Sequence, residues 1–267
     1  MITRIVSGAV LIVLAVAAVW YAPAWLFLLV AELLVVLACH EYAGLARSSR
    51  LPFPTVVSTA AAMLACASFA REALGGSVSV PLDLVLLTAL VATGALSLGS
   101  WRGGNDALAS ASAALLPTLY IGLPLGAMLA IREHDGPAAL FLLMATIMVS
   151  DSAQYFVGRA LGRRKLAAVI SPKKTVEGAY GGFLFGTLAL AWVGAWWLPA
   201  MPLAVRILLG VTVVALGMAG DLFESMLKRS AGVKDSSSLI PGHGGVLDRI
   251  DALLFAAPIY YVVLRYV

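Results

Sequence analysis

Near its C-terminal end the chain concentrates carboxylates, cations and glycines in one polar segment, residues 220–251, with the sequence GDLFESMLKRSAGVKDSSSLIPGHGGVLDRID. Carboxylates are the usual protein ligands of Mg²⁺, together with water and substrate phosphates. Lys and Arg side chains neutralise phosphate oxygens, and glycine-rich backbone can cradle a phosphate through its N–H groups. The combination predicts a site for a metal-bound nucleotide. It is not a Walker A loop, because no GxxxxGK[ST] sequence occurs.

The spacing within this segment indicates two helices joined by an irregular crossing. If the preceding apolar run continues as a helix, Asp221, Ser225 and Lys228 share one face at i, i+4 and i+7. This helix must end by Gly232. The proline and glycines that follow exclude regular structure, and a second helix is expected to begin near Asp248. The polar groups should therefore converge where the two helix ends meet.

A second polar segment, about 158–177, follows another carboxylate. Asp151 and Tyr155 share one helix face, and Lys173 and Lys174 lie farther along the segment. An ionisable residue inside a membrane span costs about 2.5–3.5 kcal/mol on insertion scales, which favours a functional interpretation. Two interpretations of Asp151 are open: it borders a site facing this segment, or it is a buried structural carboxylate.

The apolar runs of the N-terminal half contain few residues whose side chains could react or bind a ligand. Glu32 lies in the middle of one run, where it either faces a polar cavity or pairs with an Arg for structural reasons. We favour the structural role. Cys39 and Cys66 form no CxxC pair and are expected to be buried as small apolar side chains.

A membrane-embedded scaffold must position these residues. Of the 267 residues, 61% are hydrophobic and only 12% are charged, whereas soluble domains carry about 25% charged residues. One soluble core cannot bury this much apolar surface, so lipid must cover the rest. The sequence therefore predicts an all-α, polytopic integral membrane protein with about nine transmembrane helices and a polar site that faces the cytoplasm.

A transmembrane helix needs roughly 20 apolar residues. Runs of suitable length lie at about 4–22, 23–40, 54–71, 82–98, 108–131, 137–157, 178–198, 202–220 and 251–267. The first run is similar to a signal peptide, but a second run follows directly, so we expect it to remain as the first span. We treat 1–267 as a single transmembrane domain. The N-terminal helices of its bundle lie in 1–135, and the catalytic helices and loops lie in 136–267.

The distribution of basic residues predicts the orientation. With the N-terminus in the cytoplasm, 14 of the 18 Lys and Arg residues fall on the cytoplasmic side, as the positive-inside rule requires. The C-terminus is then outside, and both polar segments face the cytoplasm. The net charge of +4 comes from these short loops and includes no recognisable nucleic-acid module, so no nucleic-acid partner is expected.

The polar segments resemble the phosphatidate cytidylyltransferase family. In the C-terminal segment the matching positions are Ser225, Lys228, Arg229, Lys234, Asp235, Ser237, Ile240, Pro241, His243, Gly244, Gly245, Asp248, Arg249 and Asp251. A second block resembles the family's other cytoplasmic motif at 151–158, Ser171, Pro172, Lys173, Lys174, Thr175, Glu177, Gly178, Gly181 and Gly182. The resemblance is strong over about 150–255, and the N-terminal half matches only in hydropathy. Mild departures at Ser152, Gln154, Ser237 and Ala252 bear on substrate detail more than on the reaction.

The resemblance implies a reaction, a cofactor and an assembly. CTP and phosphatidate would give CDP-diacylglycerol and diphosphate, a step of phospholipid biosynthesis, with Mg²⁺ required. The family's fold is an all-helical membrane homodimer, here expected in the cell (inner) membrane, with a cavity open to the cytoplasm and the bilayer. By this resemblance Asp221 and Asp248 are the expected metal ligands, and Asp251 completes the shell or holds a second cation.

The expected roles follow from the chemistry of phosphate transfer. A phosphatidate oxygen attacks the α-phosphorus of CTP and is already anionic, because the second pKa of a phosphomonoester is about 6. Positioning and charge neutralisation should therefore dominate. The expected catalytic residues are Asp221, Asp248, Lys228, Arg229 and His243. The expected substrate-binding residues are Lys173, Lys174, Ser225, Lys234, Asp235, Gly244, Gly245, Arg249, Asp151 and Tyr155. His243 acts either as a base or in phosphate positioning, and we favour positioning.

Other functions compete with this interpretation. One is a related enzyme that uses CTP on another lipid, such as a lipid kinase or an isoprenoid-ether lipid cytidylyltransferase. A transporter is less favoured, because the polar residues cluster on one side of the membrane. Gly178, Gly182 and Gly186 form a stripe that serves either a dimer interface or packing within one chain.

Overall fold

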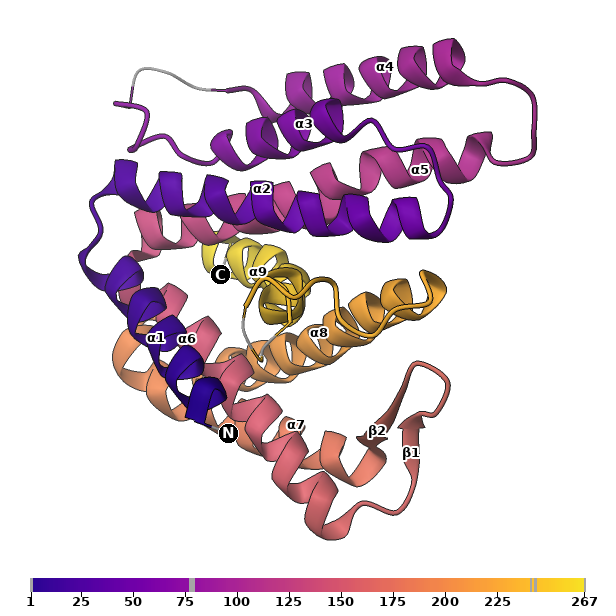
Figure 1. Ribbon diagram of the computed structural model, residues 1–267. Helices are drawn as coiled ribbons and strands as arrows, with labels where there is room; N and C mark the ends of the chain where they lie inside the picture. Colours follow the sequence, from indigo (N-terminus) through magenta and orange to yellow (C-terminus); the bar gives the residue numbers. More distant parts are fainter. Residues whose placement is uncertain (1, 77–79, 241, 243, 267) are drawn as a thin grey trace.

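The protein is built mainly of helices, with one small hairpin (Figure 1). The computed structural model describes residues 2–76, 80–240, 242 and 244–266, with residues 2–6 described by their backbone alone. Its elements are α1 (Ile2–Tyr21), α2 (Ala24–Ser48), α3 (Thr55–Ala67), α4 (Leu82–Ser100), α5 (Ala107–Pro117), the π-helical turn η1 (Thr118–Gly122), α6 (Leu123–Leu161), β1 (Lys165–Ala167), β2 (Ser171–Thr175), α7 (Val176–Trp197), α8 (Leu203–Ser230) and α9 (Leu247–Tyr266). The prediction of an all-α fold is confirmed.

Five helical segments of the described chain are long and apolar enough to cross a membrane. They are α2, α4, the continuous run from α5 through α6, α7 and α8. Every predicted span overlaps a helix, but α3 is shorter than a span requires, and the part of α1 described with its side chains, Ser7–Tyr21, is also shorter. The membrane-protein class is confirmed, and the number of nine spans stays a prediction.

The two predicted spans 108–131 and 137–157 belong to one helical run that bends at Gly136. This residue has φ 85° and ψ 169°, and Pro137 follows it. Glycine adopts a positive φ without steric cost, and proline lacks the N–H that would continue the helical ladder. The bend lets one run of helix supply two segments that point in different directions (Figure 1).

Helix α9 lies in the middle of the molecule. Figure 1 shows α2 to α5 on one side of it, and α7, α8 and the hairpin on the other. Leu247, Leu254 and Tyr260 of α9 are fully or almost fully buried, and the Tyr260 hydroxyl donates to the backbone oxygen of Ala139 on α6 at 3.0 Å. This central position brings the start of α9 against the end of α8.

Three glycines allow α7 to pack closely inside the chain. A Cβ added to Gly178 would lie 2.7 Å from the backbone oxygen of Gln154. A Cβ added to Gly182 would lie 2.6 Å from the Cγ of the same glutamine. A Cβ on Gly186 would lie 2.5 Å from Cγ2 of Val214. Of the two uses open for this stripe, the structure shows packing within one chain.

The segment 158–177, predicted as a polar loop, contains the end of α6 and the antiparallel β1–β2 hairpin. The side chain of Glu177 accepts hydrogen bonds from the backbone N–H groups of Arg163 (2.9 Å) and Arg164 (3.2 Å). Thr175 caps α7, because its hydroxyl accepts from a backbone N–H in the first turn at 3.1 Å. These bonds hold the hairpin that carries the two lysines of the predicted site.

Candidate active site

A cavity of about 890 Å³ lies between α1, α6, the hairpin, α8 and the start of α9. Most predicted site residues line it: Asp151, Tyr155, Lys173, Lys174, Asp221, Lys228, Arg229, Lys234, Asp235, Asp248, Arg249 and Asp251. The described lining contains seven Lys or Arg side chains and five carboxylates. With all of them charged, the cavity is net positive and suits a polyanionic ligand.

Lys228 lies at the centre of a buried charge cluster. It is only 8% exposed, and its ammonium forms ion pairs with Glu224 one turn earlier and with Oδ1 of Asp248 at 2.5 Å. Glu224 is fully buried. A buried cation and its carboxylates stabilise one another only when the pairing is complete. Lys228 therefore links α8 to α9 in addition to facing the cavity.

Both side-chain oxygens of Asp248 already have partners. Its Oδ2 accepts from the backbone N–H of Ser236 (3.0 Å), the hydroxyl of Ser236 (2.7 Å) and the backbone N–H of Gly245 (2.8 Å), while Oδ1 holds Lys228. Burial disfavours ionisation of Asp248, but the bonds from Lys228, Gly245 and Ser236 outweigh it and hold its pKa below the usual value. To bind a cation, Asp248 must exchange one of these partners.

An ion pair joins the hairpin to α8 across the cavity. The ammonium of Lys174 lies 2.5 Å from Oδ2 of Asp221. The hydroxyl of Ser225 is 3.4 Å from the other oxygen of Asp221, which is a long contact. One oxygen of Asp221 therefore has only a weak partner among the described residues.

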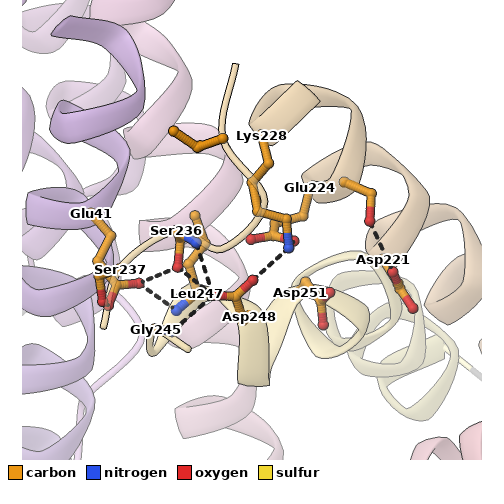
Figure 2. A network of polar contacts seen from close by, with 12 residues as sticks. Glu41, Asp221, Glu224, Lys228, Ser236, Ser237, Gly245, Leu247, Asp248 and Asp251 are labelled. Atoms are coloured by element: carbon orange, nitrogen blue, oxygen red, sulfur yellow. Dashed lines mark hydrogen bonds and ion pairs between the residues drawn. The ribbon is translucent and has the colours of Figure 1, made fainter. Parts of the chain in front are cut away.

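Asp151, Asp221 and Asp251 face the same cavity and are near enough to repel one another. Figure 2 shows Asp251 beside Asp221, and Asp248 turned toward Lys228. Over the described chain no group of three or more ligand side chains is already assembled for a metal ion. Mg²⁺ takes one or two carboxylates and completes its shell with water and substrate phosphates. The oxygens of Asp221 and Asp251 fit such a partial site.

Several predicted residues form the exposed rim of the cavity. Tyr155 is 57% exposed and accepts a hydrogen bond from Arg159 at 3.0 Å. Arg229 donates to the backbone oxygen of Val233 at 3.0 Å, and Arg249 is exposed at the start of α9. These cations remain accessible to a ligand that enters from the polar side.

Ser225, Gly244 and Gly245 are not among the described residues that line the cavity. Gly244 has φ +79°, and a Cβ added there would lie 2.8 Å from Oδ2 of Asp248, so it shapes the crossing next to the cavity. His243 and Pro241, which belong to the predicted motif, lie outside the described residues. The expected role of His243 therefore stays a prediction.

Two buried acidic residues support the site and were not assigned from the sequence. Glu224 stands at i, i+4 from Lys228, a spacing that could have suggested the ion pair. Glu41 of α2 precedes its partner Ser236 by 195 residues, and no local pattern connects them. Glu32, by contrast, forms no ion pair with an Arg among the side chains that the structure describes, and its predicted role stays a prediction.

The fold and the cavity together define the class of protein. Apolar helices suited to a membrane surround a net positive cavity in which lysines and carboxylates meet from the hairpin, the C-terminal part of α8 and the start of α9. This is a multi-pass α-helical membrane protein with a site for phosphate chemistry.

Comparison with known proteins gives the family. The sequence profile of the cytidylyltransferase family matches residues 2–267, and the chain belongs to this family of nucleotidyltransferases. It is similar to the phosphatidate cytidylyltransferase of Pseudomonas aeruginosa, with 37% identity over 268 residues, 98% of this chain and 96% of that protein. The protein of the same name from Haemophilus influenzae is 48% identical over 135 residues, 48% of this chain and 46% of that protein. The latter match spans about half of that relative, whereas the former spans nearly all of it.

Proposed function

We propose that this protein is a phosphatidate cytidylyltransferase, which converts CTP and phosphatidate to CDP-diacylglycerol and diphosphate. The observation that carries the proposal is the single cavity in which both polar segments meet, joined by the ion pair of Lys174 and Asp221. The similarity to the Pseudomonas aeruginosa protein over nearly the whole chain supports the same activity.

The proposed reaction forms one bond and breaks one. An oxygen of the phosphatidate phosphate bonds to the α-phosphorus of CTP, the bond from that phosphorus to the bridging oxygen breaks, and diphosphate leaves with the electron pair. The attacking oxygen is already ionised at neutral pH, since the second pKa of a phosphomonoester is about 6. The protein's contribution is then to orient both phosphates and to neutralise their charge.

Lysines from two elements are placed for that neutralisation. Lys173 and Lys174 approach from the hairpin, while Lys228 and Arg229 approach from the end of α8. Lys and Arg donors on opposite sides of one cavity can hold the triphosphate and the lipid phosphate in line. Exposed Lys234 lies at the rim, where it can meet the incoming nucleotide.

We include Mg²⁺ in the proposal, with Asp221 and Asp251 as the residues that would hold it. When bound, such an ion would neutralise charge on the triphosphate oxygens. Asp248 would join them only by exchanging Lys228 for the ion, because its oxygens already accept from the surrounding donors. A second cation remains part of the proposal.

The proposed location is the inner membrane, with the N-terminus, the hairpin and the cavity on the cytoplasmic side. The excess of Lys and Arg in the loops assigned to that side supports this orientation. The proposal includes a homodimer on the grounds of the family resemblance. The glycine stripe of α7 does not supply its interface, because those glycines pack against α6 and α8.

Two isotope labels test the reaction. Purified protein in lipid–detergent micelles is given phosphatidate, Mg²⁺ and CTP labelled at either the α- or the γ-phosphate. We expect label in the lipid extract from α-labelled CTP alone, and mass spectrometry should identify CDP-diacylglycerol. Lipid labelled from the γ-phosphate would indicate a lipid kinase instead. A product formed only with an isoprenoid-ether phosphate would reassign the lipid, and absence of any lipid product would reject the proposal.

A further inference from the structure

Glu41 of α2 is a buried carboxylate that binds the crossing between α8 and α9. It is 4% exposed. Its Oε1 accepts from the Ser237 hydroxyl at 2.7 Å and the Val246 N–H at 2.9 Å; its Oε2 accepts from the Ser236 hydroxyl at 3.0 Å and the Leu247 N–H at 2.8 Å. Figure 2 shows this carboxylate on the opposite side of the crossing from Lys228. Oε1 thus receives one hydroxyl and one backbone N–H, whereas Oε2 receives one backbone N–H and shares the single hydroxyl hydrogen of Ser236 with Asp248.

The bonds fall at a point where the backbone needs acceptors. Leu247 is the first residue of α9, and the N–H groups of a first helical turn have no partners within the helix. The negative charge of Glu41 also lies favourably at the positive end of the helix dipole. Glu41 therefore satisfies donors that would otherwise be buried and unpaired.

Glu41 and Asp248 hold the same turn from two sides. The hydroxyl of Ser236 lies 3.0 Å from Oε2 of Glu41 and 2.7 Å from Oδ2 of Asp248, and the Gly245 N–H also donates to Asp248. A Cβ added to Gly245 would lie 2.1 Å from Oγ of Ser236 and 2.4 Å from Oε2 of Glu41. The turn is therefore closed tightly around the two carboxylates, with no room for a side chain.

We propose that Glu41 is a positioning residue of the cytidylyltransferase reaction: by fixing Ser236, Ser237, Val246 and Leu247 it sets the place of Asp248 and, through it, of Lys228. Glu41 is not among the described residues that line the cavity, so it acts through these neighbours. This proposal rests on the proposed function. It makes catalysis depend on a residue in the N-terminal half of the chain.

The test compares Glu41→Gln with Glu32→Gln, a matched change on the same helix. The glutamine amide keeps the shape but must place a donor against one of the two backbone N–H groups. We expect kcat for CDP-diacylglycerol formation to fall roughly 10- to 100-fold, with much smaller changes in both KM values. Glu32→Gln should retain wild-type kcat. Ser237→Ala removes only one of the four bonds, so it should fold and lower kcat by a smaller factor.

Hydrogen exchange measures the same claim without any substrate. The amides of Val246 and Leu247 should exchange on the order of tenfold faster in Glu41→Gln than in the wild type or in Glu32→Gln. A wild-type kcat in Glu41→Gln would overturn the proposal. A loss of kcat accompanied by an equal loss of exchange protection in every helix would also overturn it. If wild-type protein makes no CDP-diacylglycerol, the proposed function fails, while the exchange result still decides whether Glu41 orders the crossing.

Discussion

The ammonium of Lys228 lies 2.5 Å from Oδ1 of Asp248, and this ion pair joins the last turns of α8 to the first turn of α9. Both side chains are almost completely buried. The same lysine also pairs with buried Glu224. One cation therefore compensates two carboxylates, and the geometry of the cavity depends on it.

Replacing Lys228 by Met should destabilise the protein strongly, because Glu224 and Asp248 would remain buried without a cation. Loss of one partner from a buried pair typically costs about 3–5 kcal/mol. Thermal unfolding in one detergent would measure the change, with exposed Lys234→Met as the control. Adding Glu224→Gln to Lys228→Met should restore part of the loss. An unfolding midpoint equal to that of the wild type would contradict the prediction.

Asp248 should make the stability of the protein sensitive to acid. Its pKa is lower in the folded protein than the usual value of about 3.9, so its stabilising contribution is complete above that value. The contribution is lost as the pH falls through the folded pKa. The difference in thermal midpoint between wild type and Asp248→Asn should therefore be constant near neutral pH and shrink below about pH 4. A difference that grows on acidification would be inconsistent with this.

Removal of the metal should separate the roles of the carboxylates. We expect chelation by EDTA to abolish activity and added Mg²⁺ to restore it. Asp221→Asn and Asp251→Asn should raise the Mg²⁺ concentration for half-maximal activity on the order of tenfold. Asp248→Asn should lower activity with little change in that concentration, because its oxygens hold Lys228 and the turn. A larger Mg²⁺ shift for Asp248→Asn than for the other two would instead make Asp248 a principal ligand.

Gly178→Ala should weaken the packing of α7 on α6. Its Cβ would lie 2.7 Å from the backbone oxygen of Gln154, which cannot move aside as a flexible side chain could. Overpacking of this kind usually costs about 1–3 kcal/mol. Gly94→Ala is the matched control, because a Cβ there meets nothing within 4 Å. Thermal unfolding should show the loss for Gly178→Ala alone, and a change in oligomeric state without loss of stability would contradict intrachain packing.

Much of the fold could be predicted because long apolar runs leave few alternatives to helices. The predicted end of the α8 helix by Gly232 is confirmed, since α8 ends at Ser230 and Gly232 adopts φ +73°. The hairpin at 165–175 was not predicted. Its strands have only three and five residues, and they are held in part by Glu177, which accepts from two preceding backbone N–H groups. The spacing of apolar and polar residues along the sequence does not indicate such hydrogen bonds.

The composition of the site could be predicted, but the partners within it could not. The family motif brought Asp221, Lys174 and Asp248 to one region, and the cavity includes all three. Which lysine each carboxylate binds depends on side-chain geometry that spacing along a helix does not determine. Glu41 was missed for a different reason: its partners are 195 or more residues away, and a lone carboxylate near the end of an apolar run gives no indication of them.

The pairing of charges in the cavity has a consequence for ligand binding. Lys174 pairs with Asp221, and Lys228 pairs with Asp248. A nucleotide alone would have to draw a lysine away from its carboxylate and leave that carboxylate uncompensated, whereas a metal ion on the second oxygen of Asp221 would compensate it. Arriving as a complex, the two give every displaced group a new partner. We therefore expect the nucleotide and its metal ion to bind more tightly together than either does alone.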